Sequence, residues 1–115
     1  MRTIIAGSRD ITDPQVIVDA VNACGWVPTV VISGAARGVD TLGQQWATSQ
    51  SIPVERFPAD WQKYGKAAGM IRNGQMAAVA EALIAIPSLR SKGTRDMISK
   101  AKTAGLRVYV REYCK

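Results

Sequence analysis

Residues 29–40 read TVVISGAARGVD, and this stretch decides the fold. Residues 29–32 form a short apolar run, which predicts a strand buried on both faces. Apolar side chains then recur at helical spacing over residues 39–49, which predicts a helix. Residues 33–38 form a turn of small residues whose backbone amides would be unshielded at that helix N-terminus, where they could bind an anion. The alternative is an ordinary tight turn in which Asp40 helps to cap the helix.

The same alternation of strand and helix patterns continues along the chain. Strands are predicted at residues 3–6, 53–57, 83–86 and 106–110, and helices at residues 14–24, 67–80 and 94–104. Five strands alternating with four helices predict an α/β fold, a Rossmann-like three-layer α/β/α domain with a parallel sheet of about five strands and helices on both faces. We expect one domain over residues 1–115, with the more polar strand at 53–57 on a sheet edge and a loop at 58–66.

Composition excludes several classes of function. The chain has no histidine, which removes Ser-His-Asp and Cys-His catalysis and argues against a zinc site. No apolar run approaches the roughly 20 residues of a membrane span, and the strand pattern at residue 3 leaves no space for a signal peptide. Cys24 and Cys114 lie far apart without metal-binding spacing and are interpreted as free thiols. We therefore expect a cytoplasmic protein with no cofactor, no metal and no membrane partner.

Charge is distributed unevenly along the sequence. Residues 1–57 carry four arginines, no lysine and five acids, a net charge of −1. Residues 58–115 carry eleven lysines and arginines against four acids, a net charge of +7. A basic half suits an anionic partner and predicts weak nonspecific binding to nucleic acid. It is equally the pattern of a solvated, lysine-rich helix surface.

Three loops should meet at the ligand-binding edge of the predicted sheet, because ligands bind outside the carboxyl ends of parallel strands where the strand order reverses. Residues 7–10 read GSRD, in which the glycine lets the backbone approach a ligand and Arg9 offers a planar donor fork for phosphate. Residues 33–40 form the second loop. Residues 87–96 form a long third loop with hydroxyls and cations. Taken singly, the first and third loops could also be an internally paired turn and a flexible basic surface.

Aromatic residues and an arginine precede or begin the alanine-rich helix at 67–80. Trp61 and Tyr64 could stack on a base or cover the edge of the sheet. Arg72 and its neighbour Asn73 could contact a phosphate, or Arg72 could be solvated.

Together these segments resemble the SLOG superfamily, named for the DNA-processing proteins (Smf/DprA) and the Lonely-guy phosphoribohydrolases. Residues 7–9 look like its GSR motif, and residues 33–40 are close to its SG-x-A-RG-[IV]-D motif, the most specific of these matches. Residues 72–76 are similar to its RN…M helix, and residues 93–96 to its GT-x-E segment. Residues 59–66 look most like the small stand-alone SLOG proteins of the DUF2493 or YspA type, found in phages and bacteria.

The resemblance implies a nucleotide-binding fold on which three activities occur. The preferred interpretation is binding of a nucleotide or nucleotide-derived signal, such as an ADP-ribose-like, cyclic or mononucleotide ligand, by a sensor or a sequestering protein. Hydrolysis of the N-glycosidic bond of nucleoside monophosphates is the second. It is weakened because residues 87–96 lack the double glycine of the PGG-x-GT-x-EE pattern, and Asp96 replaces the first Glu. Asp is one methylene shorter than Glu, and a catalytic group misplaced by about 1 Å can reduce the reaction rate about 100-fold. Binding of single-stranded DNA is third, because the chain offers little room for an extended strand path.

The resemblance and the loop chemistry together predict the site. The expected ligand-binding residues are Gly7, Ser8, Arg9, Ser33, Gly34, Ala35, Arg37, Gly38, Val39, Asp40, Trp61, Tyr64, Arg72, Asn73, Pro87, Gly93 and Thr94. Arg72 and Asp96 would be catalytic only in an enzyme. The expected partner is a nucleotide-derived small molecule, and the resemblance also implies a homo-oligomer.

Overall fold

The sheet seen in the computed structural model, which describes residues 1–113, has five parallel strands in the order β3-β2-β1-β4-β5. The strands are β1 (Arg2–Gly7), β2 (Val30–Ser33), β3 (Val54–Arg56), β4 (Ala82–Ile86) and β5 (Arg107–Val110). Strand β3 lies at an edge, as its polar sequence predicted. The predicted α/β class and parallel sheet are confirmed.

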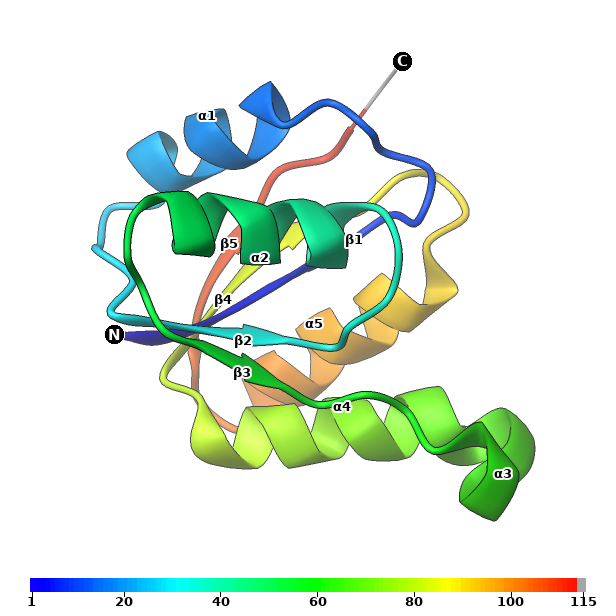
Figure 1. Ribbon diagram of the computed structural model, residues 1–115. Helices are drawn as coiled ribbons and strands as arrows, with labels where there is room; N and C mark the ends of the chain where they lie inside the picture. Colours follow the sequence, from blue (N-terminus) through cyan, green and yellow to red (C-terminus); the bar gives the residue numbers. More distant parts are fainter. Residues whose placement is uncertain (114–115) are drawn as a thin grey trace.

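Helices cover both faces of this sheet. They are α1 (Gln15–Ala23) and α2 (Val39–Ser49) on one face, and α4 (Ala68–Val79) and α5 (Lys92–Thr103) on the other (Figure 1). The segment predicted as a loop instead contains a short helix α3 (Trp61–Tyr64) and a 3-10 turn η1 (Gly65–Ala67), which project beyond the end of α4 (Figure 1). Helix α3 begins at Asp60, whose Oδ1 accepts a hydrogen bond from the amide of Lys63 at 3.1 Å.

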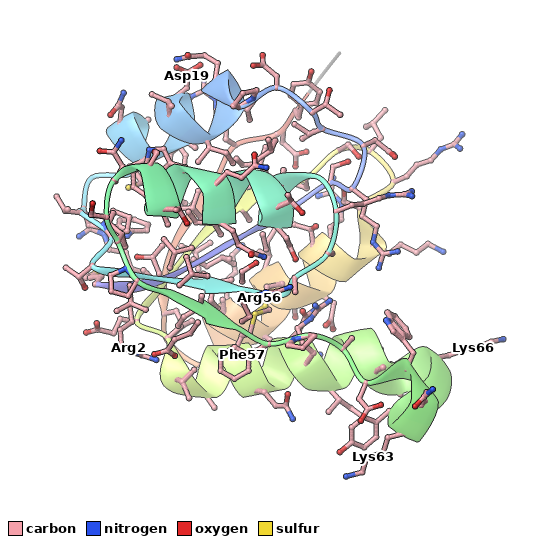
Figure 2. All side chains as sticks on the ribbon, viewed as in Figure 1. Arg2, Asp19, Arg56, Phe57, Lys63 and Lys66 are labelled. Atoms are coloured by element: carbon pink, nitrogen blue, oxygen red, sulfur yellow. The ribbon has the colours of Figure 1, made fainter. Side chains whose placement is uncertain are left out.

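The core consists of two layers, one on each side of the sheet. Ile5 and Val31 belong to the layer packed against α1 and α2, while Ile4 and Ile32 belong to the layer packed against α4 and α5. Phe57, just after β3, packs against this second layer near α4 (Figure 2). Because successive side chains of a strand point to opposite faces, a sheet covered twice needs apolar residues at every position. This explains the continuous apolar runs in the sequence.

Predicted boundaries need adjustment at the first helix and at the third loop, which ends at Ser91 because α5 begins at Lys92. The first helix begins at Gln15, one residue later than predicted, and Pro14 is its N-cap residue. The Oδ1 atom of Asp13 accepts a hydrogen bond from the Gln15 amide at 3.0 Å. Cys24 is a buried free thiol among the described residues, and Cys114 lies outside them. Among residues 1–113, no helix combines the length and apolar character needed to cross a bilayer.

The reversal of strand order lies between β1 and β4. Strand β1 pairs with β2 on one side and with β4 on the other, so the chain builds one half of the sheet before crossing to the second. The loops that follow β1, β2 and β4 lie at the carboxyl ends of the strands, on the same side of the molecule (Figure 1). This edge is where the fold favours a ligand.

Candidate functional site

The loop between β2 and α2 is shaped by its own side chains. The Oγ atom of Ser33, fully buried, accepts a hydrogen bond from the amide of Ala35 at 3.2 Å. The Oδ2 atom of Asp40 accepts one from the amide of Ala36 at 3.2 Å. Two of the amides predicted to bind an anion are therefore already bonded within the loop. Asp40 lies in the first turn of α2 and orients the loop, but it does not cap the helix, whose N-cap residue is Gly38.

Gly38 connects this loop to the one after β1. Its backbone has φ 75°, and a Cβ there would lie 2.6 Å from the Cα of Arg9 and collide with the carbonyl of Ser8. The following amide, of Val39, donates to the carbonyl of Ser8 at 3.1 Å. Only glycine fits this approach. Within residues 1–113, the amides of Arg37 and Gly38 have no protein acceptor, so they are among the loop's free donors.

A buried carboxylate and an arginine lie side by side beneath the loops. Asp40 is 6% exposed, and its burial raises the pKa of its carboxyl to about 6, against the opposing effects of the Ala36 amide and the Arg72 and Arg9 charges. Arg72 extends from α4 and donates a hydrogen bond to the carbonyl of Gly34. Helix α4 is thereby joined to the end of β2.

Asn73 and Asp96 link α4 to α5. The buried Nδ2 of Asn73 donates to the Oδ2 of Asp96 at 2.9 Å and to the carbonyl of Gly93 at 3.1 Å. The Oδ1 of Asp96 pairs with the Nζ of Lys100 at 2.6 Å. Both carboxylate oxygens of Asp96 are therefore bonded to neighbouring side chains.

Two open hollows and a small pocket adjoin at the carboxyl edge of the sheet. The tryptophan hollow, about 430 Å³, is bounded mainly by Arg9, Gly34, Arg37, Trp61 and Arg72. The serine hollow, about 280 Å³, is bounded mainly by Ser8, Arg9, Arg37, Ser88, Ser91 and Thr94. The inner pocket, about 50 Å³, lies where Arg9, Asp40, Arg72 and Thr94 meet. Arg9 borders all three, so it lies at the centre of the site.

The cations of this site are largely uncompensated. In the part of the chain that the structure describes, Arg9 and Arg37 form no ion pair and donate no hydrogen bond. Asp10 borders the serine hollow and Asp40 the inner pocket. Residues 1–113 hold no group of three or more acidic or cysteine side chains that could bind a metal ion.

Hydroxyl groups form the floor of the serine hollow. The Oγ of Ser88 donates to the Oγ of Ser8 at 3.1 Å, and the amide of Ser88 donates to the Oγ of Ser91 at 2.9 Å. Helix α5 begins directly after Ser91, so the positive end of its dipole faces the same hollow. Backbone, hydroxyl and guanidinium donors thus surround one space.

Most of the predicted site residues lie on these walls. Those that do are Gly7, Ser8, Arg9, Gly34, Ala35, Arg37, Asp40, Trp61, Arg72, Asn73, Gly93 and Thr94. Those that do not are Ser33, Gly38, Val39, Tyr64 and Pro87, and the potential catalytic residue Asp96 also lies off these walls. Ser33, Val39 and Pro87 are buried, so their side chains support the loops from below.

The two aromatic residues have different surroundings. Trp61 is 53% exposed and borders the tryptophan hollow, whereas the ring of Tyr64 lies 5.1 Å from the ammonium of Lys63. Neither covers the sheet edge as a core residue, so that alternative is wrong. Figure 2 shows Lys63 and Lys66 pointing outward from this projecting segment.

Sequence reasoning missed several wall residues. They are Ala6, Asp10, Ala36, Pro58, Ala59, Met76, Ser88, Arg90, Ser91, Lys92 and Met97. Most of them belong to loops already singled out, so treating each loop as a whole would have included them. Pro58 and Ala59 lie between β3 and α3 and border the same hollow as Trp61, a meeting that local sequence did not signal.

Comparison with known proteins identifies relatives over most of the chain. Residues 1–64 match the YAcAr family, described as the YspA, cpYpsA-related SLOG family. The "Gene 61 protein" of Mycobacterium phage D29 is 36% identical over 116 residues, covering 93% of each chain. The X-ray structure of DNA processing protein A (DprA) from Streptococcus pneumoniae is similar with a TM-score of 0.75 at 16% identity. The likeness covers 95% of this chain but only 49% of DprA, so the chain spans about half of that structure, and the likeness shows the fold alone.

Proposed function

The chain belongs to the YspA, cpYpsA-related SLOG family, and from this premise we propose that it binds a nucleotide or nucleotide-derived signalling ligand, as a sensor or a sequestering protein. One observation carries the proposal: Arg9 and Arg37 border adjoining hollows at the strand-order reversal and have no partner among residues 1–113. Unpaired guanidinium groups arranged around one space favour a phosphate, which accepts two parallel hydrogen bonds from each.

The remaining walls suit the other parts of a nucleotide. Trp61 offers an exposed ring on which a base can stack. The hydroxyl of Ser8, which accepts from Ser88 and keeps its own proton, offers a hydrogen bond to a phosphate or ribose oxygen. The tryptophan hollow, about 430 Å³, is within the size range of small-molecule sites.

Binding is better supported than hydrolysis. A general acid or base must reach the reacting atoms within hydrogen-bond distance. The carboxylate of Asp96 is instead bonded to Asn73 and Lys100, and it lies outside the hollows that Arg9 borders. We therefore assign Arg72 to phosphate binding and Asp96 to holding α4 against α5. We also propose that the protein is a cytoplasmic homo-oligomer.

Mass spectrometry of small molecules released from the purified protein on denaturation tests this proposal. We expect a phosphate-containing nucleotide from the native chain and much less from the Arg9→Ala/Arg37→Ala variant. The Lys102→Ala variant, which removes one exposed charge from α5, should release as much as the native chain. The proposal fails if native protein releases nothing and no added nucleotide raises its Tm.

A further inference from the structure

A fourth hollow adjoins the serine hollow on the side away from Trp61. This tyrosine hollow, about 380 Å³, has an apolar wall made by Ile11, Leu89 and Tyr113. It shares four residues with the serine hollow, namely Ser8, Asp10, Ser88 and Arg90. The two hollows are therefore continuous.

The hollows form one trough with a consistent chemical order. The tryptophan and serine hollows share Arg9 and Arg37, and the serine and tyrosine hollows share Arg90. An aromatic ring thus stands at each end, and cations and hydroxyls lie between them. From this order we infer that the ligand has two nucleoside-like ends joined by phosphates, with one end at Trp61 and the other at Tyr113. The inference rests on the proposed function and specifies its ligand class.

The apolar wall of the tyrosine hollow favours a ligand with a second planar group over one that leaves this hollow unfilled. Leu89 lies in the loop between β4 and α5, beside Arg90, and its apolar side chain is 91% exposed. A mononucleotide bound at Trp61 with its phosphate at Arg9 would leave this apolar wall in water. A second base or an equivalent ring would cover Leu89 and stack near Tyr113, which hydrophobic burial and base stacking both favour.

Calorimetric titration with ADP and with diadenosine pyrophosphate distinguishes a site for one nucleoside from a site for two. Both compounds carry two phosphates, but the dinucleoside has less negative charge, so charge alone would favour ADP. We expect the dinucleoside to bind about 5- to 100-fold more tightly, which is the factor that stacking of one base contributes.

Substitutions in the tyrosine hollow should lower the affinity for the dinucleoside but not the affinity for ADP. Tyr113→Ala and Leu89→Ser should weaken the dinucleoside, by about 5- to 100-fold for Tyr113→Ala, and leave ADP within about twofold. Tyr113→Phe keeps the ring and should retain the affinity. Val27→Ser is the matched control, because Val27 is 76% exposed and lies just before β2, at the amino ends of the strands.

The outcomes distinguish this inference from the function on which it rests. If ADP binds as tightly as the dinucleoside and neither Tyr113→Ala nor Leu89→Ser changes either affinity, the inference is wrong and nucleotide binding stands. If neither compound nor any mononucleotide binds, both are wrong. Should circular dichroism show that Tyr113→Ala is unfolded, Leu89→Ser decides, since its side chain is exposed.

Discussion

The guanidinium of Arg72 donates a hydrogen bond to the carbonyl of Gly34, and this contact joins the α4 layer to the loop that begins α2. A Cβ on residue 34 would collide with the Nη1 of Arg72 and lie 2.8 Å from the Oδ2 of Asp40. Glycine is therefore required there for close approach of a side chain. The contact places the Arg72 charge on the wall of the tryptophan hollow.

The variant Gly34→Ala should displace the flexible end of Arg72 and leave the backbone in place. We expect nucleotide affinity to fall by about 10-fold, as when one charge-assisted hydrogen bond is lost, with unchanged circular dichroism. Gly74→Ala is the matched control, because its added Cβ would meet only Lys100, at 3.9 Å. It should leave affinity unchanged and raise stability by about 0.5–1 kcal/mol. Native affinity in Gly34→Ala would show that the position of Arg72 is irrelevant to binding.

Asp40 should make folding stability depend on pH. Its pKa is about 6 in the folded chain and near 4 when unfolded, so the folded state binds the proton more tightly. Its contribution to stability is therefore complete below about pH 4 and is lost as pH rises through 6, a change of order 3 kcal/mol. Asp40→Asn carries no such proton. Urea unfolding from pH 4 to 7 should show native stability falling relative to the variant, and parallel profiles would contradict this.

Base release from nucleoside monophosphates should be slow or absent. Asp96→Asn should weaken the contact with Lys100 and lower stability, while nucleotide affinity stays the same, because Asp96 lies off the walls of the hollows. Chromatography of reaction mixtures for free base measures turnover directly. Robust release by the native chain that is lost in Asp96→Asn would make the protein an N-glycosidase.

Binding to DNA should be weak and governed by charge. We expect a Kd of order 10⁻⁴–10⁻⁶ M at physiological salt, a steep decrease with added salt and no preference for single strands. Removing an exposed cation far from the site, as in Lys102→Ala, should weaken it as much as Arg37→Ala. Gly38 is unsuitable for this test, because any side chain there collides with the neighbouring loop. Submicromolar, single-strand-selective binding that fails in Arg37→Ala would support a DNA-processing role.

The layers of the fold could be predicted because each strand is covered on both faces. Runs such as residues 30–32 are apolar throughout, whereas the helices carry apolar residues at helical spacing. Helix α3 was missed because it has four residues, none of them buried, so no periodic apolar signal marks it. Asp60 was a local cap signal, but such residues also occur in ordinary turns.

The site could be predicted only at the level of loops. The switch-point rule selects the edge of the sheet at which the hollows lie, but it does not say which backbone amides are already bonded or which side chains point inward. Ser33 is buried although Gly34 borders the tryptophan hollow, and Val39 is buried although Asp40 borders the inner pocket. The tyrosine hollow brings Ile11 together with Tyr113, which lies near the other end of the chain, and no local pattern predicts that meeting.

Titration of the native chain and single-arginine variants with a nucleotide panel tests the central claim most directly. The panel contains ADP-ribose, cyclic ADP-ribose isomers, cyclic dinucleotides, a dinucleoside pyrophosphate and nucleoside monophosphates. At least one should raise the Tm by about 4 °C or more at roughly 100 times its Kd, where binding adds about 2.7 kcal/mol. Arg9→Ala and Arg37→Ala should each weaken that ligand about 10- to 100-fold, and Lys102→Ala should not. If no member binds, or if both arginine variants bind like the native chain, the cation-lined hollows are not a nucleotide site.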